Sequence, residues 1–204
     1  DYVLLNQDNL GYGRAINRVV ESLCQEYQYI GAINQDVIWT QGTFEKVLDW
    51  MERHPDVSLA VPQITNKKGE VQKLCKRNPT ILGLFSRRFL SSYFKPNWLR
   101  RYDSWYVMSE FDYNEVFEAP YLSGCCMIFR ANSFYKIQGF DPSFFLYLED
   151  ADITRRLSYE GRCVHLPVAY IVHKWGRGNY RQNMLFLVNI ISALIYFRKW
   201  GLAI

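Results

Sequence analysis

The chain has 204 residues and a mass of 24.2 kDa, which gives one domain, or one and a fraction, and excludes two large domains. Hydrophobic residues make up 49%, aromatic residues 17% and charged residues 22%, a composition that excludes disordered and collagen-like proteins. The net charge of +4 is too small to indicate a nucleic-acid binder, but it is compatible with phosphorylated ligands or an anionic membrane surface.

The first third of the chain alternates short apolar strands with amphipathic helices. We expect strands over 2–5, 29–33 and 57–61, and helices over 15–27 and 44–51. This alternation predicts βαβ units, with parallel strands that are joined by right-handed crossovers. The chain enters a strand-like run at its second residue, which favours a fragment of a longer protein.

Residues 63–120 form a basic, aromatic-rich insertion in which the regular pattern weakens. Two interpretations stay open: a solvated helical excursion that covers one edge of the sheet, or a surface that faces an acceptor or a membrane. Beyond the insertion we expect strands over 121–130, 162–166 and 169–172, and helices over 134–137, 149–159 and 184–197. The last helix is too short to span a bilayer, and it either lies in a membrane interface or packs on the sheet or on a partner subunit.

The five cysteines are scattered, with no CxxC pair and no histidine at zinc-finger spacing. Neither a disulfide framework nor a structural zinc site is therefore expected. Residues 1–6 lack the basic and apolar pattern of a secretory signal, and we expect a cytoplasmic location with reduced thiols.

The first candidate site is the tripeptide Asn34-Gln35-Asp36, which follows the strand at 29–33. Ligands gather at the carboxyl ends of strands in a parallel sheet. A carboxylate at this position can hold a divalent metal ion that bridges two phosphates. The alternative is an aspartate that makes a turn or caps the next helix.

The second candidate site is the acidic start of the helix at 149–159, where Glu149, Asp150 and Asp152 lie close together. Residues three apart share a helix face, so Glu149 and Asp152 lie together while Asp150 points elsewhere. Arginines follow Asp152 at helical spacing, whereas Asp150 lacks an obvious local partner. A partly desolvated, unpaired carboxylate suits a general base. The alternative is the favourable placement of acidic residues in the first turn of a helix.

Among the three histidines, His173 is the functional candidate. It ends a predicted strand and precedes a cationic, glycine-containing loop at 174–178, a setting that suits metal ligation or phosphate contact. His165 lies inside a strand and is expected in the core, and His54 is expected at the surface.

These motifs together resemble the inverting family 2 glycosyltransferases, and most closely the bacterial rhamnosyltransferase-like branch. In chain order they are Asn9-x-Gly11-x-Gly13-x-Ala15-x-Asn17, Asn34-Gln35-Asp36, Gly124-Cys125-Cys126-Met127-Ile128-Phe129-Arg130, Gly139-Phe140-Asp141, Phe144-Phe145, Glu149-Asp150-x-Asp152 and His173. The match extends across nearly the whole chain. It departs from the family pattern at Gln35, where the branch has proline, and in lacking an initial strand, helix and strand of roughly fifty to seventy residues.

The resemblance implies an α/β GT-A fold, that is, a Rossmann-like mixed sheet flanked by helices, truncated at the N-terminus. Residues 1–180 would form a partial GT-A domain that contains the insertion at 63–120, and 181–204 a C-terminal apolar helix. The implied enzyme is an inverting hexosyltransferase of bacterial cell-surface polysaccharide biosynthesis. It would use a nucleotide-sugar donor, with dTDP-rhamnose as the candidate, a saccharide or lipid-linked acceptor, and Mg or Mn.

The resemblance also implies roles for individual residues. Asp150 would be the base that deprotonates the acceptor hydroxyl for a single in-line displacement. Asp36 and His173 would contact the metal, Asn34 would contact the donor, and Gly124 would allow a sugar to approach closely. The cofactor-binding positions carried over are Asn34, Asp36, Gly124, Glu149 and His173.

Two other classes remain as alternatives: a non-catalytic, degenerate GT-A module for binding or interaction, and a metal-dependent phosphohydrolase, which needs more clustered carboxylates than the sequence contains. Expected partners beyond the substrates are the cytoplasmic face of the inner membrane and a second copy of the chain, and nucleic acid is not expected. The isolated chain is expected to be inactive, because the family's nucleotide-binding segment is absent from it.

Overall fold

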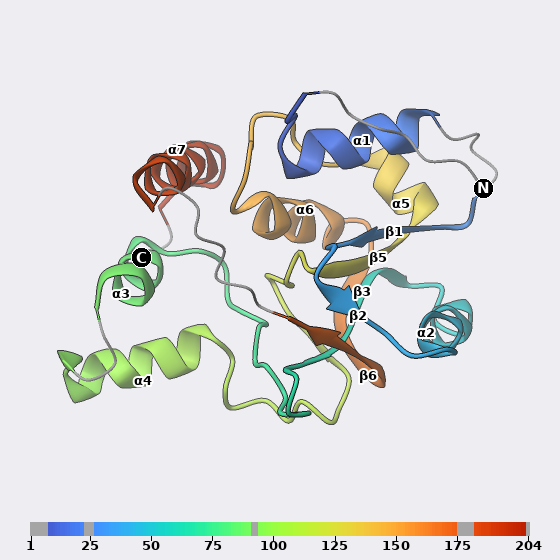
Figure 1. The fold of residues 1–204 in the computed structure, drawn as a ribbon, viewed down its shortest axis with the longest axis horizontal. Helices are drawn as coiled ribbons and strands as arrows, with labels where there is room; N and C mark the ends of the chain where they lie inside the picture. Colours follow the sequence, from blue (N-terminus) through green and yellow to red (C-terminus); the bar gives the residue numbers. More distant parts are fainter. Residues whose placement is uncertain (1–7, 23–26, 91–93, 175–181, 203–204) are drawn as a thin grey trace.

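The computed structural model describes residues 8–22, 27–90, 94–174 and 182–202, and it has a six-stranded mixed sheet at its centre (Figure 1). The strands are β1 (Tyr29–Ile33), β2 (Val37–Ile38), β3 (Val57–Thr65), β4 (Phe117–Glu118), β5 (Cys126–Arg130) and β6 (Arg162–His173). Their order is β1-β5-β3-β6-β2, and β4 pairs with β6 outside this path. The expected mixed α/β fold is therefore present. The strand expected over 2–5 lies outside the described residues.

The sheet departs from the expected parallel βαβ arrangement at β5. This strand lies between β1 and β3 and is antiparallel to both, with Ile33 opposite Cys126 and Ala60 opposite Ile128. Only β3 and β6 form a parallel pair among the described strands. β1 and β3 do run in the same direction, as expected for the strands at 29–33 and 57–61, but β5, from much later in the chain, lies between them.

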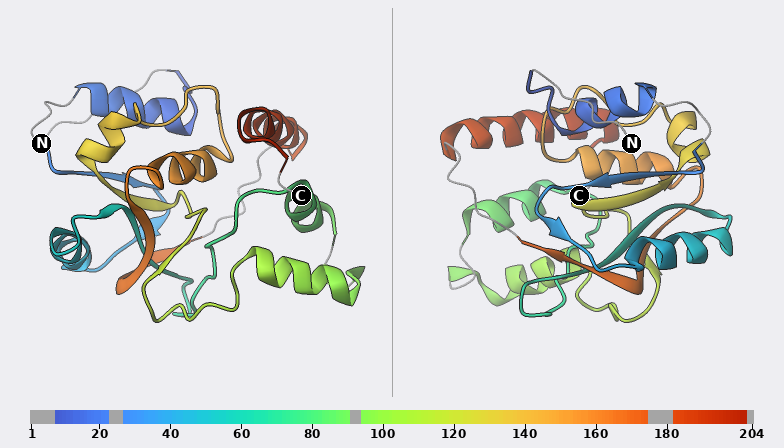
Figure 2. Two further views of the ribbon diagram at one scale, coloured as in Figure 1. Left: turned by 180° about the vertical axis from the view of Figure 1, so that it is seen from behind. Right: turned by 45° about the vertical axis from the view of Figure 1, so that its right-hand side comes forward.

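Seven helices are described, and they flank the sheet. They are α1 (Tyr12–Ser22), α2 (Thr43–Glu52), α3 (Ile81–Phe89), α4 (Asn97–Tyr106), α5 (Ala131–Lys136), α6 (Glu149–Leu157) and α7 (Gln182–Trp200). Helices α1, α5 and α6 lie on one side of the sheet and α2 lies on the other (Figures 1 and 2). Because helices cover both faces, β3 is buried along almost its whole length, including the polar residues Ser58 and Thr65.

The insertion at 63–120 contains α3, α4 and β4. Thr80 caps α3 by accepting a hydrogen bond from the Gly83 amide at 3.0 Å. The two helices are joined by Asp103 of α4, which accepts a hydrogen bond from Ser86 at 2.8 Å and forms an ion pair with Lys95. In the described residues, the insertion thus contains a helical hairpin of α3 and α4, and α3, α4 and α7 lie together beside the sheet, away from α2 (Figures 1 and 2).

Helix α7 packs against α6 through one side only. Tyr196 is 1% exposed, Ser192 donates a hydrogen bond to the Leu146 carbonyl at 2.7 Å, and Trp200 donates to Asp152 at 2.8 Å. In the described structure, the helix therefore packs on α6 and not directly on the sheet as expected, and its opposite side is apolar and exposed. Within the described part of the chain, no helix has both the length and the apolar character needed to cross a membrane.

Candidate active site

The two candidate sites meet at one end of the β1–β5 pair. Since Ile33 is opposite Cys126, the segments that leave β1 and enter β5 are adjacent, and the Asn34 amide donates to the Cys125 carbonyl at 2.9 Å. Burial raises the pKa of the Cys125 thiol to about 11, and the charges of Asp150 and Asp36 act in the same direction. Both carboxylates therefore lie near one residue, and the two motifs form a single site.

Asp36 and His173 are brought together by the pairing of β2 with β6. Val37 is opposite His173, and the Asp36 carbonyl accepts a hydrogen bond from the Lys174 amide at 3.0 Å. As a result Oδ2 of Asp36 lies 3.3 Å from Nε2 of His173. The tripeptide also forms the turn that was the alternative interpretation, because the Val37 amide donates to the Asn34 carbonyl at 3.1 Å. Asp36 can therefore belong to this turn and still place its carboxylate beside His173.

The Asp36–His173 pair fits a metal ion that is shared with a phosphorylated ligand. Among the described residues, no group of three or more His, Cys, Asp or Glu side chains is arranged to hold a metal. Mg²⁺ and similar hard ions often take only one or two protein ligands and complete their coordination with phosphate oxygens and water. Nδ1 of His173 is buried without a hydrogen-bond partner in the described structure, so no protein contact fixes the proton on that side of the ring.

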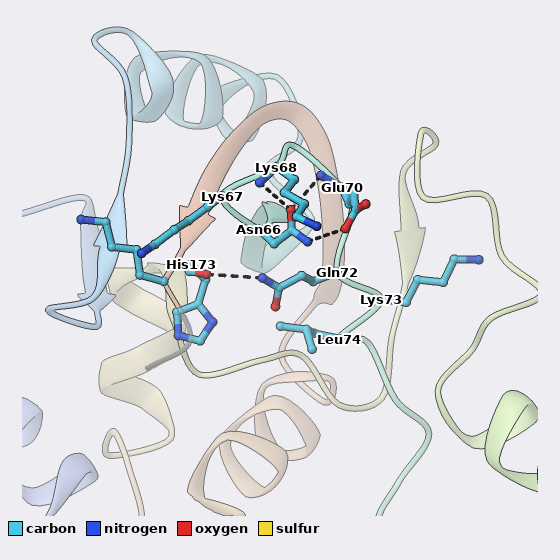
Figure 3. Close-up of a pocket in the computed structure, with 9 residues that line it drawn as sticks. Asn66, Lys67, Lys68, Glu70, Gln72, Lys73, Leu74 and His173 are labelled. Atoms are coloured by element: carbon cyan, nitrogen blue, oxygen red, sulfur yellow. Dashed lines mark hydrogen bonds between the residues drawn. The ribbon is translucent and has the colours of Figure 1, made fainter. Parts of the chain in front are cut away.

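An open pocket of about 650 Å³ adjoins His173 (Figure 3). Four lysines line it: Lys67, Lys68, Lys73 and Lys174. Gln72 donates hydrogen bonds from Nε2 to the carbonyls of His173 at 3.4 Å and Thr65 at 3.2 Å, and so holds the lysine-bearing loop against the end of β6. The excess of positive charge suits an anionic ligand beside the Asp36–His173 pair.

Asp150, at the start of α6, is held by two backbone amides. Its Oδ2 accepts a hydrogen bond from Gly124 and its Oδ1 accepts one from Ala151, each at 3.0 Å. The expectation that Asp150 lacks a local partner is therefore wrong. A Cβ atom on Gly124 would lie 3.1 Å from Cβ of Asp150, so the glycine allows the carboxylate to reach the backbone. Close approach of a sugar at Gly124 stays a prediction.

The unpaired carboxylate of this motif is Glu149. Its side chain is buried, and Oε2 has no hydrogen-bond partner among the described residues. Burial, and then the nearby charge of Asp150, raise the pKa of Glu149 to about 8. Asp152, by contrast, forms the expected ion pair with an arginine, Arg156, at 2.8 Å. The three carboxylates thus have three different environments within one helical turn.

The backbone that delivers Asp150 is strained. Tyr147 and Leu148 both have positive φ, 72° and 64°, although neither is glycine. Such conformations persist only where the surrounding structure imposes them, and they concentrate at functional sites. Here they turn the chain into α6 so that Glu149 and Asp150 are the first helical residues.

Residues 2–138 match the family model described as Glycosyl transferase family 2. This chain belongs to glycosyl transferase family 2. The sequence is 29% identical over 177 residues to an N-acetylglucosaminyl-diphospho-decaprenol L-rhamnosyltransferase of Mycobacterium tuberculosis, a match that covers 81% of this chain and 56% of that protein. It is 24% identical over 173 residues to the rhamnosyltransferase WbbL of Escherichia coli K12, covering 80% of this chain and 60% of that protein.

The fold agrees with this assignment. A crystal structure of GalNAc-T7 with UDP, GalNAc and Mn²⁺ superposes with a TM-score of 0.61 at 13% identity, covering 87% of this chain and 33% of that protein. The resemblance to family 2 and to its rhamnosyltransferases, stated from the motifs alone, is confirmed. The GT-A fold is confirmed as well. This family 2 chain spans a little over half the length of the curated relatives that it matches.

The site of this family 2 glycosyltransferase contains three further residues that the motifs did not indicate: Tyr12, Lys76 and Tyr121. The Tyr12 hydroxyl donates to the Gly124 carbonyl at 2.6 Å. Lys76 and Tyr121 exchange backbone hydrogen bonds, and Nζ of Lys76 lies 4.1 Å from the centre of the Tyr121 ring. Burial raises the pKa of Tyr121, and the charge of Asp150 raises it further. In the sequence, Lys76 is one of many cations in the insertion, and nothing there distinguishes it.

Proposed function

We propose that this chain carries the base and the diphosphate-side residues of an inverting glycosyltransferase. The enzyme would transfer a sugar from a nucleoside-diphosphate donor to a hydroxyl group of a saccharide or lipid-linked acceptor. The observation that supports this proposal most strongly is that one segment, Gly124-Cys125, contacts both motifs: Gly124 donates to Asp150, and Cys125 accepts from Asn34 of the strand end that carries Asp36. A base on one side and a phosphate-binding group on the other are what a single displacement requires.

In the proposed reaction, the Asp150 carboxylate takes the proton of the acceptor hydroxyl while the hydroxyl oxygen bonds to the anomeric carbon. The bond between that carbon and the diphosphate oxygen breaks, and its electron pair leaves with the diphosphate. Because the attack is opposite to the leaving group, the configuration of the anomeric carbon inverts. The Gly124 and Ala151 amides fix the orientation of the Asp150 carboxylate, so it need not reorganise during the reaction.

On the other side of the site, Asp36 and His173 would hold Mg or Mn, and Asn34 follows the same strand end. A bound metal would neutralise negative charge that develops on the leaving diphosphate. The lysines of the adjoining pocket supply further positive charge from this chain's own residues. The proposal of a divalent cofactor is also supported by the Mn²⁺ in the GalNAc-T7 structure.

We further propose a rhamnosyl donor, such as dTDP-rhamnose, and a lipid-linked saccharide acceptor of bacterial cell-surface polysaccharide biosynthesis. The names of the two relatives support this choice, since both are rhamnosyltransferases and one acts on a sugar carried by diphospho-decaprenol. Residues 1–180 would form the catalytic domain with its insertion at 63–120, and 181–204 the added C-terminal helix.

A specific feature favours peripheral membrane association. Helices α3 and α7 contact each other through Phe89 and Phe186, whose ring centres are 5.6 Å apart. Six apolar side chains of these helices are more than half exposed: Ile81, Phe85, Phe89, Met184, Leu187 and Leu194. Arg87 and Arg88 lie on the same hairpin. An apolar surface with adjoining arginines matches the interface of an anionic bilayer.

The proposed function can be tested in a sugar-transfer assay. Each of several nucleotide sugars is offered with a lipid-linked N-acetylglucosamine acceptor, with and without a chelator, and NMR determines the anomeric configuration of the product. We expect transfer from a deoxythymidine-diphosphate sugar, inversion of configuration and loss of activity with the chelator. Retention of configuration would contradict the single displacement. Nucleotide binding without transfer from any donor would support the non-catalytic module instead.

A further inference from the structure

We propose that a small cationic pocket between α3 and α7 binds a phosphate or diphosphate group of the acceptor. The pocket has a volume of about 190 Å³ and is separate from the lysine-lined pocket beside His173. Its lining includes Lys76, Arg87, Arg88, Tyr106, Tyr121 and Asn189. This inference rests on the proposed function, because it assigns one part of the substrate of the same site.

The charges of this pocket are unbalanced. Within the described structure, no ion pair is formed by the three cations of the pocket, Lys76, Arg87 and Arg88. Burial lowers the pKa of Lys76; the negative charge of Asp150 opposes this shift, and the positive charge of Arg87 adds to it, so the two cations are close enough to repel each other. Arginines in the last turn of α3 are favoured by the helix dipole, but that effect does not account for Lys76, which lies before the helix. An anion between these side chains would remove the repulsion.

Neutral hydrogen-bond donors complete the pocket. Tyr106 is 1% exposed, and its hydroxyl is buried without a hydrogen-bond partner among the described residues. Buried hydroxyl groups are rarely left unpaired, so an unpaired one that belongs to a pocket wall points to a ligand. Asn189 contributes an amide from the opposite helix, α7. A phosphate group, which accepts hydrogen bonds at several oxygens, matches this set of donors.

The position of the pocket identifies the acceptor, and not the donor, as the source of the anion. Lys76 and Tyr121 form its wall toward the base, since the charge of Asp150 acts on the pKa of both residues. The donor diphosphate belongs with Asp36 and His173, whose pocket shares no lining residue with this one. A molecule with its hydroxyl at Asp150 and an anionic group at Lys76 would therefore be the acceptor. The exposed apolar faces of α3 and α7 suit a chain attached to that anionic group.

The test compares two acceptors in a transfer assay that contains no bilayer. Both carry N-acetylglucosamine, one through a diphosphate to a short polyprenyl chain and the other as an uncharged alkyl glycoside. We expect Arg87→Gln and Arg88→Gln to raise the KM for the charged acceptor roughly tenfold to a hundredfold, the effect of losing a hydrogen bond to a charged group. The KM for the uncharged acceptor and for the donor should stay unchanged. Tyr106→Phe should act in the same direction with a smaller effect.

Arg18→Gln is the matched control, because Arg18 is an exposed arginine of α1, away from the pocket. An equal change in KM for both acceptors would overturn the inference. If the wild-type protein transfers sugar to neither acceptor, the proposed function fails, and the pocket is then judged by binding alone. Calorimetric titration with inorganic pyrophosphate should show weaker binding to Arg87→Gln than to the wild type or to Arg18→Gln. Equal binding to all three proteins would overturn the inference that this pocket binds a diphosphate.

Discussion

Two regions of the molecule are built in opposite ways. One is the end of the sheet, where Asp36, Gly124 and Asp150 lie; the other is the helical layer formed by α3, α4 and α7. At the end of the sheet, polar groups are fixed by backbone hydrogen bonds: Asp150 by Gly124 and Ala151, and Asn34 by Cys125. In the helical layer, apolar side chains are exposed, and the cations of the small pocket lack ion-pair partners within the described structure. The first region fixes the geometry of a reaction, whereas the second offers a surface to something outside the chain.

This difference indicates that the end of the sheet carries out the reaction, whereas the helical layer recognises the acceptor or the membrane. Positioned carboxylates must be rigid, because a displaced base loses much of its effect. A surface that contacts a long apolar or anionic molecule needs matching area and charge more than fixed positions. Substitutions at the end of the sheet should therefore change turnover, and substitutions in the helical layer should change KM and location. The following predictions test this division, beginning with the largest effect.

Asp150→Asn should abolish turnover. The amide retains the shape of the carboxylate but cannot accept a proton from the acceptor, and removing a positioned base typically costs roughly 100-fold to 10,000-fold in rate. Donor binding, measured by calorimetry with the nucleoside diphosphate, should stay unchanged. Asp49→Asn on the exposed face of α2 makes the same chemical change away from the site and should have no effect. Full turnover by Asp150→Asn would remove Asp150 as the base.

Glu149→Gln should make stability less dependent on pH. The pKa of Glu149 rises from its usual 4.5 to about 8 on folding, so between these values the folded state keeps a proton that the unfolded state releases. The Glu149 carboxyl therefore lowers the free energy of unfolding as pH rises from about 4.5 to about 8. Below this range it has no such effect, and above it the full penalty is present. Each tenfold difference in proton affinity between the folded and unfolded states corresponds to about 1.4 kcal/mol, which gives a penalty on the order of a few kcal/mol.

The variant lacks this penalty. Chemical denaturation should therefore show Glu149→Gln to be more stable than the wild type at pH 8.5, with the difference disappearing near pH 4.5. Glu115→Gln, at an exposed position, serves as the control. A stability difference that is constant with pH would mean that the Glu149 carboxyl does not change its pKa on folding.

The two regions also differ in how far the sequence predicts them. Family motifs indicated Asp36, Gly124, Asp150 and His173, and the structure brings all four to one end of the sheet. The sequence could not show that β5 lies between β1 and β3, because strand order depends on contacts between distant segments. It also assigned the unpaired carboxylate to Asp150 and not to Glu149, since the amide of Gly124 comes from a segment 26 residues away.

Other motif residues turned out to support the site from a distance. A Cβ atom on Gly13 would lie 2.7 Å from Cβ of Phe140, so this glycine lets α1 pack closely on the loop that precedes α6. The Asn17 side chain donates to the Phe140 carbonyl at 2.7 Å and accepts from its amide at 2.9 Å. The pattern shared with the family thus includes residues that fix the loop leading to Asp150. The helical layer has no such motif, and its cationic pocket could not be recognised before the fold was known.

The apolar surface of the helical layer can be tested by flotation with liposomes that contain anionic lipids. The double variant Phe85→Ser/Leu187→Ser removes two side chains that are more than half exposed, one from α3 and one from α7. We expect membrane binding to fall on the order of tenfold, because each lost side chain contributes apolar area to the interface. Tyr159→Ser, at a position that is 73% exposed beyond α6, is the control and should bind as the wild type does. Absence of wild-type binding at low salt would refute membrane association.

Tyr12→Phe should have the smallest effect and tests how the motif at the start of α1 supports the base. The hydroxyl donates to the Gly124 carbonyl at 2.6 Å, and the Gly124 amide holds Asp150, so Tyr12 acts on the base through one residue. The ring packs edge-on against Phe140, with ring centres 5.7 Å apart, a contact that phenylalanine retains. We expect a stability loss of about 1 kcal/mol from the lost hydrogen bond and a reduction in kcat of less than roughly tenfold, with KM for the donor unchanged. Tyr27→Phe, at an exposed position, should change neither quantity. A loss of turnover as large as that of Asp150→Asn would place the Tyr12 hydroxyl in the chemical step itself, as a group that contacts the acceptor.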